Sequence, residues 1–488
     1  MALAVLIIYG VFLTFIFFYS LVQLHLAWTY ARNREEANAE VAPELEEHEW
    51  PHVTVQLPVF NEFYVVERLI NTVAEIDYPK GKLEIQVLDD STDESFEVAA
   101  KCIAGWKAKG LDIVHIQRPD RVGYKAGALA YGLTTCKGEF TAIFDADFVP
   151  RKDFLRRTIP FMVKNNNLGV VQTRWEHLNE DYSMLTRLQA FGLDAHFTVE
   201  QCGRNQSGHF INFNGTAGVW RNKCIEEAGG WQHDTITEDL DLSYRAQLKG
   251  WKFKYLVNVG SPAELPAEMN ALKNQQFRWT KGAAECTVKN LPKVLRMRDF
   301  GVGTKVNAVF HLMNSFIFIC VLAAALLSVP ILLIKASTHA YDLLFNLASI
   351  FLISFLILSY FYYVSRPRDT RGRFLKFLAK FPMFLAVSMG LSLHNSIAVF
   401  EGYIGRKTPF VRTPKFAIEQ AKGTWSDKKY RALKANPLTL IEGLLALYFL
   451  AGICFAVYAQ EYGLLPFHLM LSIGFGFVFY YSIKHTRV

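Results

Sequence analysis

Six long apolar runs divide this chain more sharply than any other feature of its sequence. They cover residues 4–28, 306–334, 342–364, 377–400, 441–459 and 463–483. Most of them reach the roughly 20 residues that a helix needs to cross a bilayer. Between residues 31 and 305 no such run occurs. The sequence therefore predicts a helical membrane part and one large domain outside the bilayer.

The first apolar run has no basic stretch before it and is longer than the apolar core of a secretory signal. We therefore expect it to stay in the mature protein as a membrane anchor. The seven cysteines are scattered without C-x-x-C spacing. Neither a disulfide framework nor a zinc site is predicted from them.

The net charge of +7 comes from basic residues that lie at the ends of apolar runs, as in a membrane protein. This placement argues against a nucleic-acid partner. Basic residues follow the first apolar run, precede the second between Lys289 and Lys305, and follow the third between Arg366 and Arg373. Such ends are usually cytoplasmic. The link at 335–341 and the turn at Gln460 are poor in basic residues, so we expect them outside.

The fourth run, 377–400, conflicts with this charge pattern. If it crossed the membrane, the basic segment from Arg406 to Lys434 would lie outside. We therefore interpret 377–400 as an interfacial or re-entrant segment. Five spans remain, with the amino terminus outside and the large domain and the tail after Lys484 inside. A bacterial inner membrane and a Golgi-type membrane both fit this topology.

Within the large domain, short apolar runs alternate with helical patterns. Strands are expected at 53–57, 83–88, 113–116 and 140–144, and helices near 62–76 and 93–109. This alternation is typical of a parallel sheet covered by helices and joined by right-handed crossovers. The domain is therefore predicted to be α/β.

Polar residues follow three of these strands, where sheets of this type bind ligands. The first strand is followed by Asn61 and Glu62, the second by Asp89 and Asp90, and the fourth by Asp145 and Asp147. A G-x-G-x-x-G motif does not follow the first strand, which disfavours a dinucleotide fold. A metal-bound nucleoside diphosphate fits this edge better.

Asp145 and Asp147 lie two residues apart in an extended segment, so their side chains share a face. They can reach one point beyond the strand, and that point suits Mg²⁺ or Mn²⁺. For this motif alone, surface acids at a turn are the alternative. The other acidic strand ends favour the metal.

Two further segments suit a phosphate ligand or a helix start. Gly123 to Leu129 opens a helix with small residues and Lys125, which suits close approach to phosphate; an ordinary capped helix is the alternative. Thr237-Glu238-Asp239 leads the amphipathic helix from Leu240 to Lys249, and by itself is a capping pattern.

Four motifs together resemble a known signature. They are Asp89-Asp90, Asp145-Ala146-Asp147, Thr237-Glu238-Asp239 and Gln275-Gln276-Phe277-Arg278-Trp279. The set is similar to the D, D-x-D, (T/E)-E-D and Q-x-x-R-W signature of processive family 2 glycosyltransferases, which include cellulose, chitin and hyaluronan synthases. The resemblance covers almost the whole chain. It implies a cytosolic α/β GT-A domain with a Rossmann-like mixed sheet, plus an α-helical transmembrane bundle.

Plant cellulose-synthase-like A and C proteins, the glucomannan and xyloglucan-backbone synthases, are more similar still. Segments that carry this resemblance are Val87 to Asp93, Tyr124 to Leu129, Phe154 to Arg157, His196 to Gln201 and Phe213 to Trp220. Late in the chain, Phe410 to Lys415 looks like the F-x-V-T-x-K gating loop of cellulose synthases. Arg412 and Pro414 depart from the usual pattern there, which makes the gating role a weaker expectation than the catalytic one.

The resemblance implies a role for each matching residue. Asp239 is the expected general base, with Glu238 beside it, and Asp145 and Asp147 are the expected metal ligands. The residues expected to bind the nucleotide sugar are Asn61, Glu62, Asp89, Asp90, Lys125, Asp145, Gln275 and Arg278. Those expected to bind the acceptor are Trp279, Phe213, Asn214 and Gly215, and those of the gating loop are Phe410, Thr413 and Lys415.

We therefore predict an inverting, processive transferase that makes a β-linked hexose polymer and moves it across the membrane. UDP-glucose is the favoured donor and GDP-mannose the second. A non-processive enzyme that glycosylates a polyprenyl phosphate or diacylglycerol shares the metal site but does not need Q-x-x-R-W. A non-catalytic scaffold or transporter would leave the acidic strand ends without a role.

The predicted organisation has five parts. They are an anchor at 1–30, the GT-A domain at 31–300, two spans at 301–365, an interfacial and gating segment at 366–440, and two spans with a short cytosolic tail at 441–488. Besides donor and metal, the expected partners are the growing polysaccharide and the lipid bilayer. An oligomer and an accessory export partner are left open.

Overall fold

A seven-stranded sheet forms the centre of the domain outside the helical bundle. The computed structural model describes residues 2–338, 341–367, 372–408, 411–420, 423–426, 428–430 and 436–487. The strands are β1 (Val53–Val59), β2 (Leu83–Asp89), β3 (Ile113–Ile116), β4 (Phe140–Ile143), β5 (Leu168–His177), β6 (Gly218–Arg221) and β7 (Lys252–Ala263). Their order across the sheet is β3-β2-β1-β4-β6-β5-β7.

The first four strands confirm the prediction of a parallel arrangement. β1 pairs in parallel with β2 on one side and β4 on the other, and β2 pairs in parallel with β3. β1 is buried almost throughout, because helices cover both faces of the sheet. β6 runs antiparallel to both β4 and β5, so the whole sheet is mixed, as the resemblance implied.

Eight helices of this domain surround the sheet. They are α2 (Val66–Ala74), α3 (Ser95–Ala108), α4 (Tyr124–Leu133), α5 (Phe154–Lys164), α6 (Met184–Ala195), α7 (Gln201–Gln206), α8 (Asn222–Glu227) and α9 (Glu238–Leu248). A π-helical turn, η3 (His196–Glu200), joins α6 to α7. α2 begins four residues later than predicted, because Asn61 adopts a left-handed conformation (φ 54°) at the end of β1.

The pairing register of β1 with β2 and β4 brings the acidic strand ends together. Val59 pairs with Asp89 across β1 and β2, while Gln56 pairs with Ile143 across β1 and β4. The residues after these strands therefore emerge at one edge of the sheet, as the sequence predicted.

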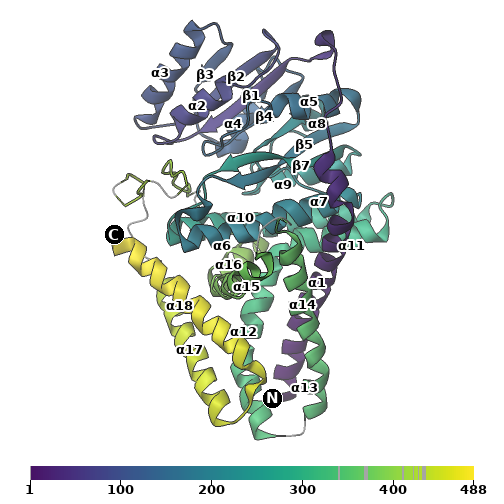
Figure 1. Ribbon diagram of the computed structural model, residues 1–488, viewed down its shortest axis with the longest axis vertical. Coiled ribbons are helices and arrows are strands. Elements are labelled where there is room, and N and C mark those ends of the chain that lie inside the picture. The colour runs from purple at the N-terminus through teal and green to yellow at the C-terminus, as the bar shows by residue number, and fades with distance from the viewer. Residues whose placement is uncertain are drawn as a thin grey trace.

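The remaining helices form the bundle and its junction with the sheet domain. They are α1 (Ala2–Ala39), α10 (Met269–Arg296), α11 (Val302–Leu312), α12 (Phe316–Ser337), α13 (Asp342–Ala348), α14 (Leu352–Val364), α15 (Arg373–Gly390), α16 (Ser392–Tyr403), α17 (Leu438–Tyr458) and α18 (Leu465–Arg487). In Figure 1 the sheet domain lies at one end and the bundle at the other, with α10 across the junction between them. The amino terminus lies at the end of the bundle that points away from the sheet.

Five helical segments among the described residues are long and apolar enough to cross a membrane. They are Ala2–Ala39, Val302–Ser337, Asp342–Val364, Leu438–Tyr458 and Tyr462–Thr486. The predicted interfacial run corresponds to α15 and α16, which meet at an angle of 49°. A bend of this kind belongs to a re-entrant segment or to a broken span, so the interfacial arrangement stays a prediction.

Two buried lysines fasten α10 to the bundle. Lys273, only 2% exposed, lies 2.8 Å from the carboxylate of Glu442 on α17. Further along α10, Lys281 donates two hydrogen bonds of 2.6 Å. They go to the carbonyl of Arg406 and to the hydroxyl of Thr408, just beyond α16. Removing one partner of a buried ion pair costs about 3–5 kcal/mol, because the other charge is left unpaired. α10 is therefore held at a defined depth and rotation.

We predict that the segment after α16 lies on the same side of the membrane as the sheet domain. Cysteines would be introduced as Lys407→Cys and Thr424→Cys in intact cells, or in sealed vesicles that enclose the sheet domain. An impermeant thiol reagent added outside should not label them. Thr338→Cys, at the far end of α12, should be labelled. The exposed native Cys454 should first be replaced by alanine.

Detergent-opened membranes serve as the control, because all three cysteines should then react. Labelling of Lys407→Cys from outside in sealed vesicles would contradict the proposed topology.

Candidate active site

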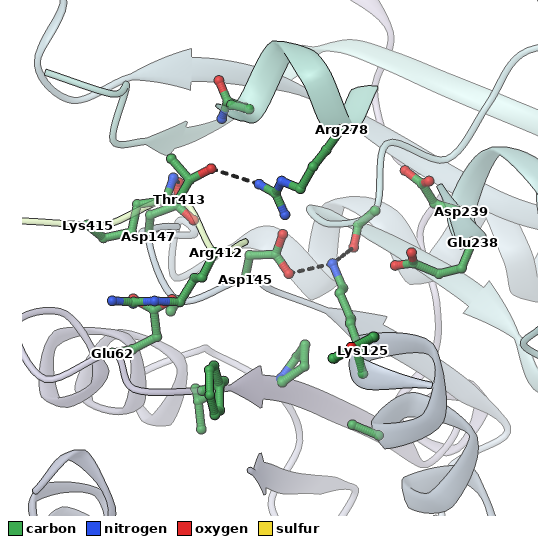
Figure 2. Close-up of a pocket in the computed structure, with 18 of the residues that line it drawn as sticks. Glu62, Lys125, Asp145, Asp147, Glu238, Asp239, Arg278, Arg412, Thr413 and Lys415 are labelled. Atoms are coloured by element: carbon green, nitrogen blue, oxygen red, sulfur yellow. Dashed lines mark hydrogen bonds and ion pairs between the residues drawn. The ribbon is translucent and has the colours of Figure 1, made fainter. Parts of the chain in front are cut away.

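A cavity of about 230 Å³ opens at the edge of the sheet where the acidic strand ends converge. Its walls come from the ends of β1, β2 and β4, from the starts of α4 and α9, from α10 and from the segment 412–415. Figure 2 shows the labelled side chains from these separate elements pointing toward one another. Residues far apart in the sequence thus share one site.

Both carboxylates of the D-x-D motif are paired with lysines. Lys125 Nζ lies 2.5 Å from Asp145 Oδ1 and donates a second hydrogen bond, of 2.7 Å, to the carbonyl of Gly215. Lys415 Nζ lies 2.5 Å from Asp147 Oδ2, and both side chains are 10% exposed. Although burial lowers the pKa of Lys125, the charges of Asp145 and Glu238 outweigh it and raise that pKa.

The oxygen atoms of Asp145 and Asp147 fit a hard divalent cation only in part. The described residues bring no third Asp, Glu, His or Cys close enough to complete a metal site. Mg²⁺ commonly takes one or two carboxylates and completes its shell with substrate phosphates and water, so two carboxylates are sufficient here. A cation at Asp147 Oδ2 would compete with the ammonium of Lys415.

Glu238 and Asp239 begin α9 and face the same cavity. Burial raises the pKa of Asp239, and the neighbouring Glu238 carboxylate raises it further. Burial also raises the pKa of Glu238, against the opposing charge of Lys125. A carboxylate with a raised pKa suits a proton acceptor.

Gly215 allows this close assembly. It adopts a left-handed conformation (φ +79°), and a Cβ atom there would lie 3.1 Å from Asp239 Oδ2 and 3.5 Å from Lys125 Nζ. A side chain at this position would therefore press directly on the proposed base.

α10 contributes three predicted residues, Gln275, Arg278 and Trp279, to the cavity wall. Arg278 donates a 2.8 Å hydrogen bond to the hydroxyl of Thr413 (Figure 2). Trp279 lies beside Trp175, with ring centroids 6.4 Å apart. Two adjacent indole rings form an aromatic wall of the kind that sugar rings contact.

The π-helical turn η3 supports this wall from behind. Its Phe197 stacks on Trp175 at 4.7 Å, and its His196 Nε2 accepts a hydrogen bond of 3.3 Å from the side-chain NH2 of Asn214, which lines the cavity. π-helical turns inside α-helices frequently occur at functional sites. Here the extra residue in the turn sets the directions of two side chains at once.

The segment 411–418 crosses the cavity from the bundle side. Arg412 lies 2.7 Å from Glu62 Oε2, and the backbone N–H of Phe416 donates a 2.8 Å hydrogen bond to Glu264 Oε1. Burial raises the pKa of Glu62 to about 7, although Arg412 opposes that shift. Thr413 and Lys415 thus lie in the cavity, as predicted from the sequence, while Phe410 falls outside the described residues.

Three predicted site residues do not face the cavity. Phe213 is fully buried and its ring packs 5.5 Å from Trp220, so it belongs to the core and not to an acceptor site. Asp89 is 1% exposed and accepts a hydrogen bond from Ser91 N while contacting His115. Asn61 hydrogen bonds to the loop at Thr92. Asp89 and Asn61 thus bond to the loops at the strand ends, and their contact with the nucleotide stays a prediction.

Asp90 does line the cavity, and it brings a residue that the sequence reasoning missed. Arg118 donates two hydrogen bonds to its carboxylate, of 2.8 and 2.6 Å. Arg121, Trp175 and Arg412 were likewise not predicted, although all three line the cavity. The departure of Arg412 from the gating-loop pattern was the single sequence signal that could have found one of them.

Comparison with known proteins agrees with this geometry. Residues 51–282 match the family model described as "Glycosyltransferase like family 2". This segment is a family 2 glycosyltransferase domain. It spans the sheet and the first half of α10, and it contains all four motifs from which the resemblance was inferred.

Relatives of the glycosyltransferase domain include plant proteins. The chain is 42% identical to glucomannan 4-beta-mannosyltransferase 1 of Oryza sativa subsp. japonica, over 59% of this chain and 58% of the relative. It is 44% identical to glucomannan 4-beta-mannosyltransferase 2 of Arabidopsis thaliana, over 57% of this chain and 52% of the relative. The chain thus spans little more than half the length of these relatives. The predicted resemblance to glucomannan synthases is confirmed.

A solved structure shares the fold. A mannosyltransferase from Pyrobaculum calidifontis, solved with GDP-Man and Mn²⁺, aligns with a TM-score of 0.53 at 16% identity, over 83% of this chain and 100% of its own. The predicted GT-A fold is confirmed by the mixed sheet and by this likeness.

We predict that Lys415 competes with divalent cations for Asp147. In Lys415→Met the carboxylate loses its ammonium partner, so Mn²⁺ should bind about tenfold more tightly in the absence of nucleotide. Electron paramagnetic resonance of free Mn²⁺ measures this affinity. Lys429→Met is the matched control, since Lys429 pairs with the exposed Glu94 outside the cavity. Equal Mn²⁺ affinity in wild type and Lys415→Met would contradict the competition.

Proposed function

We propose that the protein is an inverting hexosyltransferase that extends a β-linked mannan or glucomannan chain from a nucleoside diphosphate sugar. One observation carries this proposal: a single cavity brings together the D-x-D carboxylates, Asp239 and the Gln275, Arg278 and Trp279 side chains of α10. A catalytic base, a diphosphate site and an aromatic acceptor wall are the parts that such a transfer needs.

The base acts on the acceptor. Asp239, ionised, takes the proton of an acceptor hydroxyl while that oxygen forms a bond to the anomeric carbon of the donor. The bond from this carbon to the diphosphate oxygen breaks at the same time, and the nucleoside diphosphate leaves. Because attack comes from the face opposite the leaving group, an α-linked donor gives a β-linked product. Lys125 holds Gly215 close to Asp239 and so keeps the base in place.

The donor diphosphate needs positive charge. Lys125, Arg278 and Lys415 all line the cavity beside the D-x-D carboxylates. Asp145 and Asp147 would hold a Mg²⁺ or Mn²⁺ ion, which supplies Lewis-acid assistance to departure of the diphosphate. When the donor binds, its phosphates offer Arg278 and Lys415 new anionic partners in place of Thr413 and Asp147.

The relatives favour mannose as the transferred sugar. Both of the relatives named above are mannosyltransferases. We therefore propose GDP-mannose as the donor, where the sequence alone had favoured UDP-glucose. Trp279 and Trp175 would contact the terminal sugar of the acceptor through their apolar faces.

The growing polymer would pass from this cavity toward the bundle. α10 carries the acceptor wall on one side and packs on α16 of the bundle on the other. A chain lengthened at Trp279 therefore begins at the junction between domain and membrane. This position favours processive synthesis with translocation over a glycolipid product, whose lipid acceptor needs no aromatic wall of this kind.

We predict that transfer depends on an ionised Asp239. Because its pKa is raised, the carboxyl stays protonated, and inactive as a base, at pH values where an ordinary aspartate, with a pKa of about 4, is ionised. The rate of transfer should therefore fall, as pH is lowered, well before pH 4. In Asp239→Asn, transfer should drop about 10²- to 10⁴-fold while GDP affinity changes little. Loss of GDP binding in this variant would instead indicate a structural role.

Product analysis tests the function itself. Purified protein incubated with Mn²⁺ and GDP-mannose should form a polymer that β-mannanase digests. A chelator, or Asp147→Asn, should lower the rate about 100-fold or more, since a metal supplies several kcal/mol of charge stabilisation. Full activity with a chelator would overturn the metal role, and polymer from UDP-glucose but not from GDP-mannose would overturn the donor.

A further inference from the structure

One wall of the cavity carries an arginine to which the proposed reaction gives no role. Arg121 lines the cavity together with residues from the ends of β1 and β2 and the start of α4. This part of the wall consists of Pro58, Val59, Phe60, Leu88, Asp90, Arg121, Tyr124 and Ala128. Phe60, Leu88 and Ala128 give this part of the wall an apolar surface, and a flat aromatic base would fit against it better than a phosphate or a sugar.

Arg121 has few partners of its own. Its guanidinium stacks on Phe60, with Cζ 3.2 Å from the ring centroid, and lies 5.0 Å from the ring of Tyr124. Its nearest anion is Asp90, 3.8 Å away, which is too long for a hydrogen bond. Within the described part of the chain, its Nε is buried and donates to no acceptor. The side chain as a whole is 30% exposed.

Asp90 does not need Arg121 for charge balance. Both of its carboxylate oxygens accept hydrogen bonds from Arg118, which also donates to the carbonyls of Val122 and Tyr124. Arg118 thus performs the structural task of tying the loop before α4 to the end of β2. Arg121 is a second cation beside a carboxylate that is already satisfied.

Stacking on Phe60 fixes the plane of the Arg121 guanidinium, and the side chain stays 30% exposed at the cavity wall. A guanidinium whose plane is fixed in this way can donate two parallel hydrogen bonds to one ligand. Burial lowers the pKa of Arg121, against the opposing charge of Asp90. A ligand that offers two acceptors side by side would give the Arg121 guanidinium the hydrogen-bond partners that it lacks within the described residues.

Guanine offers such a pair and uracil does not. N7 and O6 of guanine are adjacent acceptors, and they make bidentate hydrogen bonds with arginine. Uracil presents its O4 acceptor next to the N3–H donor, which would point at the N–H groups of the guanidinium. The same arginine therefore attracts one base by two bonds and the other by at most one.

We infer that Arg121 binds the N7 and O6 edge of the donor's guanine and thereby selects GDP over UDP. This inference rests on the proposed function, since it assigns the base-recognition residue of the same donor site. Phe60 would hold the guanidinium in the plane of the base. Lys125 and the D-x-D carboxylates would then lie at the diphosphate, because Lys125 follows Tyr124 at the start of α4.

The test measures binding of GDP and of UDP separately, by titration calorimetry on the full-length protein in detergent with Mn²⁺ present. Wild type should prefer GDP. Arg121→Ala and Arg121→Lys should each weaken GDP binding about 10- to 100-fold and leave UDP binding within about threefold. Lysine keeps the charge but not the fork, so it separates bidentate recognition from simple attraction.

Arg156→Lys is the matched control. Arg156 also lies over an aromatic ring, that of Trp50, and pairs with a carboxylate, that of Asp77, but it lies outside the cavity. Its substitution should leave the ratio of GDP to UDP affinity unchanged. Unfolding temperatures of all variants should be recorded beside the titrations.

The outcomes separate this inference from the proposed function. Equal weakening of GDP and UDP in the Arg121 variants, an unchanged ratio, or a wild type that prefers UDP would overturn the role of Arg121. Full retention of GDP affinity in Arg121→Lys would do the same. If the ratio changes as expected but no sugar is transferred from GDP-mannose, the inference stands and the proposed function falls.

Discussion

The need to neutralise clustered carboxylates organises the whole site. Glu62, Asp145, Asp147, Glu238 and Asp239 line one partly buried cavity, where ionised carboxylates without counter-charges are costly. The compensating cations come from three different parts of the chain. Lys125 comes from the start of α4, Arg278 from α10, and Arg412 and Lys415 from the segment after α16. Electrostatics thereby links the sheet domain, the junction helix and the bundle at one point.

This arrangement makes ligand binding an exchange of partners. Lys415 occupies Asp147 and Arg412 occupies Glu62, so the site without substrate is already close to charge balance. A metal ion and a diphosphate bring equal and opposite charges and can take over these pairs one by one. Phe416, which is 1% exposed and packs with Ala267 and Ile418, anchors the segment directly after Lys415. The segment thus joins a buried anchor to ionic contacts with Glu62 and Asp147, and its gating role stays a prediction.

α10 connects the cavity to the helical bundle. Its two buried lysines, Lys273 and Lys281, hold it against α17 and the end of α16, and the residues between them reach into the cavity. Because the ion pairs are buried, a rotation of α10 would break them at a cost of several kcal/mol. Trp279 is thus kept in one position beside Trp175, and Arg278 beside Thr413. The bundle therefore determines how Trp279 faces Asp239 in the cavity.

The sequence alone determined the elements and most of the chemistry. Strand length, helical periodicity and long apolar runs depend on neighbouring residues, so β1, β2, β4 and the five apolar segments could be predicted, as could the carboxylates that follow the strands. Direction and pairing of side chains depend instead on residues distant in the sequence. For this reason only the tertiary structure showed Phe213 in the core, Asn61 bonded to the loop after β2, Asp89 in contact with His115, and Trp175 beside Trp279. It also decided that Lys415 lies on Asp147 and that Arg121 stacks on Phe60. A contact across 268 residues, as between Asp147 and Lys415, exists only once the chain has folded.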